Sequence, residues 1–124
     1  MKKTFYYFLI LFTFSSCDPS CQKLMFVNNT SDSIFYRLLT DTILKQNYYI
    51  YSIGPNDSTK PLFVMGGCGA WEYKINKESM DSTLYVFVLK TDKLNDSIIS
   101  NHEYKRFDFK VKDLDSLKWR IVYN

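Results

Sequence analysis

Apolar residues recur with a period near two along most of this chain, as expected for β-strands that turn one face to a core. Residues 106–112 alternate charged with apolar side chains, and residues 118–123 repeat the alternation around Trp119 and Ile121. Residues 84–89 are continuously apolar, which is typical of a central strand covered on both faces. The same reasoning predicts further strands at 24–27, 34–39, 48–53 and 71–75.

Turn-forming residues separate these segments, at 28–32, 54–57, 66–69 and 77–82. About seven short strands at this spacing predict a mainly β fold, either a small antiparallel β-sandwich or an open barrel. Helical periodicity is confined to residues 94–103 and to a single turn through Leu117 that Asp113 is placed to cap. We therefore expect one or two short helical turns, and a single β-rich domain over residues 23–124.

The first sixteen residues have the layout of a secretory signal. A short positive segment, residues 1–3, precedes an apolar run over residues 4–14. This run is about half the ~20 residues that a membrane-spanning helix needs. We therefore expect residues 1–16 to be a cleaved signal peptide and the bilayer to be reached by another means.

Cys17 follows the apolar run, directly after the small residues Ser15 and Ser16. This arrangement resembles the lipobox of bacterial lipoproteins, and it implies a lipid attached to Cys17 with residues 17–22 as a tether. The residues between Cys17 and Cys21 reach at most about 15 Å when extended, so we expect the domain to sit close to the bilayer. An ordinary cleaved signal with a free Cys17 is the alternative.

Cleavage also changes the charge of the chain. Removing Lys2 and Lys3 leaves 14 basic and 13 acidic side chains, a net charge of +1. So small a charge makes nucleic acid a poor candidate and gives only weak attraction to anionic lipid. The expected partners are the membrane, through the lipid anchor, and an envelope protein or glycan.

Two cysteines remain once Cys17 is lipidated, and an exported protein meets an oxidising compartment. We predict a disulfide between Cys21 and Cys68, which would stabilise the fold by about 4 kcal/mol in the loop-entropy model. A redox pair is the rival interpretation, but the C-x-x-C spacing is missing. Because His102 is the only histidine and no ligand spacing accompanies it, we expect neither a metal nor a cofactor.

The mature chain resembles the small lipoproteins of Bacteroidetes, which are typically of unknown function. The resemblance is carried by residues 27–36, 53–55, 71–72, 81–87 and 113–123. It implies export, lipid anchoring and a β fold, and it transfers no active site. Such bacteria often display lipoproteins on the cell surface when acidic residues follow the lipidated cysteine. Here Asp18 does so, and Lys23 follows soon after, so periplasmic and surface orientations both stay open.

Asp followed by Ser or Thr, and then by Ile, Leu or Thr, occurs six times in the chain. The pattern is similar to the O-glycosylation signal of exported Bacteroidetes proteins. The candidate acceptors are Ser33, Thr42, Ser58, Ser82, Ser97 and Ser116. Ordinary turn and cap chemistry is the alternative explanation.

Motifs of common enzymes are missing: the sequence has no nucleophile elbow, zinc-protease helix, phosphate-binding loop or dinucleotide fingerprint. His102 lies beside Glu103, but neighbours on a strand point to opposite faces, so a solvated histidine is favoured over an acid/base pair. The glycine-rich residues 66–69 are better explained as a hairpin loop than as a ligand loop. We therefore expect a protein that is not an enzyme.

Tyr48, Tyr49 and Tyr51 cluster around Ile50. Alternation predicts Tyr49 and Tyr51 on one face and Tyr48 on the other. The cluster is a candidate binding patch, because tyrosine combines flat apolar area with a polar tip. The alternative is that these rings fill the core of a small domain.

These observations together predict a membrane-anchored, non-catalytic binding or structural module of the cell envelope, most simply at the outer membrane. An inhibitor of a periplasmic or host hydrolase is the alternative, and it would use residues 66–70 as a protruding loop.

Overall fold

The computed structural model describes residues 23–124. The predicted signal peptide, the tether, Cys17 and Cys21 lie outside the described residues. The seven strands are β1 (Met25–Asn28), β2 (Ile34–Leu39), β3 (Tyr51–Ile53), β4 (Asp57–Ser58), β5 (Leu84–Leu89), β6 (Lys105–Phe109) and β7 (Arg120–Tyr123). The helical elements are α2 (Ala70–Tyr73), the π-helical turn η2 (Lys74–Glu78), α3 (Asp96–Ser100) and α4 (Val111–Ser116).

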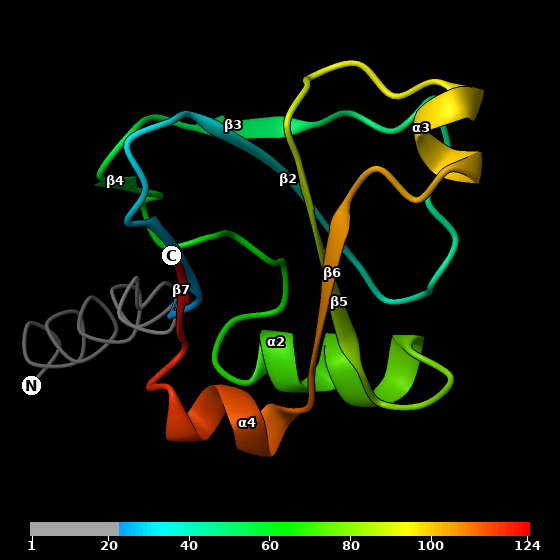
Figure 1. Ribbon diagram of the computed structural model, residues 1–124. Coiled ribbons are helices and arrows are strands. Elements are labelled where there is room, and N and C mark those ends of the chain that lie inside the picture. The colour runs from blue at the N-terminus through cyan, green and yellow to red at the C-terminus, as the bar shows by residue number, and fades with distance from the viewer. Residues whose placement is uncertain (1–22) are drawn as a thin grey trace, which may run out of the picture.

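The strands form two separate sheets (Figure 1). One has the order β4-β1-β7 and the other the order β3-β2-β5-β6, and they are not closed into a barrel. The prediction of a mainly β fold with about seven strands is therefore confirmed. Within the described residues, four of the five strand pairings are antiparallel as predicted, and the exception is β7, which pairs with β1 in parallel, with Phe26 opposite Ile121. The physical reason is that α4 reverses the chain after β6, so the last strand runs in the direction of the first.

Strand β5 is the centre of the larger sheet, and all six of its residues are buried. One face of this sheet packs on the smaller sheet and on α2, η2 and α4, with Phe26, Trp71, Ile75, Leu114 and Ile121 among the buried residues. The other face carries a second cluster under the loops that flank β2 and β5, with Leu44, Ile50, Tyr85, Phe87 and Leu89. A chain of this size thus covers both faces of one sheet.

The predicted strand at 71–75 is wrong, because this segment is helical from Ala70 to Glu78. Trp71 and Ile75 are four residues apart, so a helix brings both side chains into the core, while Tyr73 stays exposed. The Trp71 indole Nε1 donates to the Leu62 carbonyl at 3.1 Å. Burial of the tryptophan thereby fixes the helix on the sheet.

Helical content within residues 23–124 is higher than expected, with three short α-helices and a π-helical turn in place of one or two turns. Helix α3 lies in the expected segment, where the Asn95 side chain accepts from the Ile98 amide at 2.8 Å. Helix α4 starts earlier than predicted. Asp113 is not its N-cap: Lys110 is, and the Asp113 carboxylate reaches back to the Lys110 amide at 2.8 Å.

Two strand boundaries also differ from the predictions. Only residues 51–53 of the expected strand at 48–53 pair with β2, and the expected strand at 106–112 ends at Phe109. The predicted turn at 54–57 leads directly into the two-residue strand β4. The end of β6 follows from pairing length, because Phe109 lies opposite Leu84, the first residue of β5.

Candidate functional site

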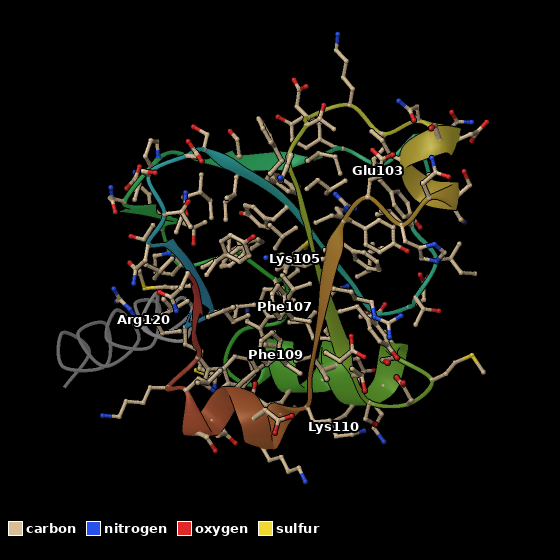
Figure 2. The ribbon with its side chains drawn as sticks, in the orientation of Figure 1. Glu103, Lys105, Phe107, Phe109, Lys110 and Arg120 are labelled. Atoms are coloured by element: carbon tan, nitrogen blue, oxygen red, sulfur yellow. The ribbon has the colours of Figure 1, made fainter. Side chains whose placement is uncertain are left out.

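A groove of about 760 Å³ opens at one end of the two sheets. Four separate parts of the chain line it: the turn between β1 and β2, the end of β5, the segment from α3 into β6, and Tyr123 at the end of β7. Figure 2 places Glu103 and Lys105 where the chain enters β6, and both residues line the groove. Helices α2 and α4 lie at the opposite end of the sheets (Figure 1).

One wall of the groove is held in place by Asn28, which is fully buried at the end of β1. Its Nδ2 donates to the carbonyls of Asp32 (2.7 Å) and Gly54 (2.9 Å). Its Oδ1 accepts from the amide (3.0 Å) and the hydroxyl (2.7 Å) of Thr30. Because Thr30 and Asp32 both line the groove, this buried amide fixes the shape of its rim.

Aromatic rings form part of the groove wall. Tyr104 is half-buried and packs against Phe87 with ring centroids 5.3 Å apart, and the His102 ring lies 5.7 Å from Tyr104. Across the groove, Tyr123 has the Lys105 ammonium 5.4 Å from its ring centroid. These contacts hold the rings in place at a wet surface, where they offer flat apolar area with polar edges.

The charged groups of the groove have both signs. Asp32 and Glu103 supply carboxylates, while Lys90 and Lys105 supply ammonium groups, and all four side chains are exposed. Hydroxyls of Thr30, Ser33 and Thr91 lie among them. His102 and Glu103 are both exposed, in agreement with the prediction of a solvated histidine. The arrangement suits hydrogen bonding and stacking with a polar ligand.

The predicted tyrosine patch lies elsewhere, at the edge of the larger sheet. Tyr49 and Tyr51 are 70% and 47% exposed with ring centroids 4.9 Å apart, whereas Tyr48 packs on the second core cluster. Arg37 crosses between them: its guanidinium lies 5.2 Å from the Tyr48 ring and donates to the Tyr49 carbonyl at 3.1 Å. The rings are therefore arranged as alternation predicts, and their role in binding stays a prediction.

A polar cluster that the sequence did not reveal lies at the turn before β5. The Tyr85 hydroxyl and the Ser79 hydroxyl both donate to the Asp81 carboxylate, and they lower the pKa of Asp81, Tyr85 most strongly. The same hydrogen bond, with burial, raises the pKa of Tyr85. The cluster shapes a turn outside the groove, so we assign it to stability.

The candidate glycan acceptors are accessible to different degrees. Ser82 is half-buried, and the other five are exposed: Ser33, Thr42, Ser58, Ser97 and Ser116. Ser33 lies on the groove wall. Exposure permits modification, and glycosylation stays a prediction.

The predicted cysteine sites are only partly within the described residues. Cys68 is disulfide-bonded and lies in the exposed loop at 66–69, where three glycines have positive φ. Its expected partner, Cys21, and the expected lipid site, Cys17, lie outside the described residues. The Cys21–Cys68 pairing and the lipidation therefore stay predictions.

No protein-family model, curated protein or solved structure matches this chain. The resemblance to Bacteroidetes lipoproteins accordingly stays a prediction. Within residues 23–124, no helix is both long enough and apolar enough to span a bilayer. The same part of the chain contains no group of three or more metal-ligating side chains placed to hold an ion.

Sequence reasoning did not identify the groove. Its charged and aromatic residues come from segments up to about 90 positions apart in the chain, from Thr30 to Tyr123. Each segment separately has the composition of an ordinary turn or strand end. The one available signal was the cluster of turn residues at 28–32, which predicts a loop without naming a ligand.

Proposed function

We propose that this protein is a lipid-anchored, non-catalytic binding module of the cell envelope, and that its groove takes a segment of an envelope protein or a glycan. One observation carries the proposal. Strand β1 begins at Met25, two residues after the described chain starts, and ends at Asn28, which holds the groove wall. A lipid on Cys17 would leave the groove at the far end of the strand, open to a partner.

The composition of the groove supports recognition of a polar ligand. Tyr104 and Tyr123 offer flat surfaces for a sugar ring or a peptide side chain, and carboxylates and ammonium groups lie close to both. Binding sites in general combine apolar area with a few placed polar groups. The groove differs from the Tyr49–Tyr51 patch in being concave and in drawing on both sheets.

The alternative, inhibition of a hydrolase, receives less support. Residues 66–69 of its expected loop are exposed and include the disulfide-bonded Cys68, as an inhibitory loop requires, but Ala70 is buried at the start of α2. However, three of the five residues are glycines and a fourth is the bonded cysteine, so few side chains are left to fill an enzyme's subsites.

Photo-crosslinking in the native envelope tests the proposal. A p-benzoylphenylalanine placed at Glu103 samples the groove, one placed at Tyr51 samples the tyrosine patch, and one placed at the exposed Asn76 is the control. We expect a discrete adduct from Glu103 that neither of the other positions gives, and we expect Tyr123→Ala to abolish it. An adduct from Tyr51 without one from Glu103 would contradict the groove and favour the tyrosine patch.

A further inference from the structure

Two large apolar side chains are exposed on the segment between β4 and α2. Phe63 is 73% exposed and Met65 is 83% exposed. Their neighbours Leu62 and Val64 are partly buried and pack against the core that includes Phe26. The segment therefore alternates as a strand does, but its outward positions are apolar. Outward positions of a wetted strand are ordinarily polar, so two neighbouring apolar ones make this segment a candidate contact surface.

The position of this segment is fixed by backbone hydrogen bonds to β1. The Thr59 amide donates to the Phe26 carbonyl at 2.9 Å, and the Leu62 amide donates to the Leu24 carbonyl at 2.8 Å. The segment thus runs antiparallel to β1, from its end toward its start. Phe63 and Met65 follow on the side from which the chain enters the domain.

The length of chain outside the described residues limits how far this surface lies from the anchor. Seven residue steps separate Cys17 from Leu24, and a fully extended chain of that length reaches at most about 25 Å. Leu62 is hydrogen-bonded to Leu24, so its neighbour Phe63 lies within a similar distance of a lipid on Cys17. A bilayer is consequently the largest apolar phase within reach of the two side chains.

The charge of the segment also suits a lipid surface. No acidic residue occurs between Asp57 and Glu72, and Lys60 is the one basic residue in that stretch. Glu72 itself is paired with Lys23. An exposed lysine beside an exposed phenylalanine and methionine is a combination found where proteins rest in the headgroup region of a membrane.

We propose that Phe63 and Met65 insert into the bilayer interface beside the lipid anchor and so fix the orientation of the domain, with the groove turned away from the membrane. This inference rests on the anchor at Cys17 that belongs to the proposed function. The contact would restrict a domain that an acyl chain alone would leave free to rotate.

Quenching by brominated lipid tests the contact in the full mature lipoprotein. The acylated protein is reconstituted in vesicles of phosphatidylcholine and phosphatidylglycerol with bromine on the acyl chains. Phe63→Trp and Met65→Trp place an indole at the proposed contact, and Tyr49→Trp is the matched control, since Tyr49 is 70% exposed at the edge of the other sheet. The native Trp71 and Trp119 are buried, and the unsubstituted protein supplies their background.

We expect the added indole of both test variants to shift its emission to the blue in vesicles and to be quenched by the brominated lipid, while the added indole of Tyr49→Trp is neither shifted nor quenched. Two test positions keep the result decisive if one variant fails to fold. An acylated protein in which neither indole is quenched overturns this inference and leaves the anchor standing. A protein whose mass shows no acyl chain overturns both this inference and the anchor on which the proposed function depends. If the indole emission shifts to the blue only as the protein concentration rises, and the brominated lipid does not quench it, the surface contacts a second copy of the chain instead of the bilayer.

Discussion

Replacing Asn28 with alanine should destabilise the domain more than any other change of a single polar side chain in the smaller sheet. Asn28 is fully buried at the end of β1 and makes four hydrogen bonds of 3.0 Å or shorter, two as donor and two as acceptor. Asn28→Ala removes all four while leaving the strand sequence otherwise unchanged.

The expected loss follows from these contacts. A neutral hydrogen bond contributes about 1 kcal/mol net, so four contribute about 4 kcal/mol. Asp32 is exposed and regains water in the variant, whereas Thr30 and Gly54 are both half-buried and regain less. Because some of the groups freed by the substitution regain hydrogen bonds to water, we expect the free energy of unfolding to fall by about 3 kcal/mol.

Urea unfolding of the oxidised protein measures this loss. With a slope of about 1.5 kcal/mol per molar, the midpoint should fall by about 2 M. Asn29→Ala is the matched control, because Asn29 is exposed and its side chain makes one long hydrogen bond, of 3.3 Å, to Asn124; it should change stability by less than about 0.5 kcal/mol. A loss below about 1 kcal/mol for Asn28→Ala would refute the assignment of the groove wall to this network.

Three further predictions concern the core and pH dependence. Leu114→Ala, in the fully buried face of α4, should cost about 3 kcal/mol in urea unfolding, whereas the exposed Leu117→Ala should cost little; equal effects would contradict the packing of α4. Burial raises the pKa of Tyr36 from 10.0 to about 12, so the stability that neutral Tyr36 contributes is complete below pH 10 and is lost as the pH rises toward 12. Tyr36→Phe should therefore flatten the alkaline loss of stability in pH-dependent unfolding, and an unchanged alkaline limb would count against this burial. The Tyr85 hydroxyl lowers the pKa of Asp81 from 3.8, so Asp81 contributes stability that is present above that value and is lost as the pH falls through the lowered pKa. Asp81→Asn should weaken the acid dependence of the unfolding midpoint, and an acid limb identical to that of the parent protein would refute the contribution of this carboxylate.

The two central strands could be predicted from sequence because their signal is local. Residues 84–89 are all apolar or aromatic, residues 34–39 are so apart from Arg37, and turn residues bound both segments; the structure has strands with those bounds. Both run through the middle of the larger sheet, where burial on two faces demands such a composition. The first and last residues of both strands could therefore be predicted from the neighbouring residues alone.

The helix at 70–78 escaped prediction because its pattern satisfies two periodicities. Trp71, Tyr73 and Ile75 alternate with charged residues, yet Trp71 and Ile75 are also spaced as one face of a helix. Tertiary packing decides the outcome, since only the helix buries Trp71 and Ile75 while leaving Tyr73 in solvent. The segment is too short for its apolar pattern alone to distinguish a helix from a strand.

The parallel pairing of β1 with β7 and the shape of the groove could not be predicted from the sequence, for a different reason. Met25 and Arg120 are far apart in the chain, and nothing in either strand specifies its partner. The groove then follows from that pairing, because Tyr123 reaches it only as the last residue of β7. The tyrosine patch was accessible to sequence reasoning because Tyr49 and Tyr51 are near neighbours in the chain.

Both proposals depend on the lipid at Cys17, and the intact mass of the protein purified from its native membrane tests it most directly. The measurement is made before and after reduction with thiol alkylation, beside a Cys17→Ala variant. We predict the loss of residues 1–16, added acyl mass, two thiols that appear only on reduction, and release of Cys17→Ala from the membrane fraction. A wild-type mass without lipid, together with identical fractionation of Cys17→Ala, would contradict the anchored module.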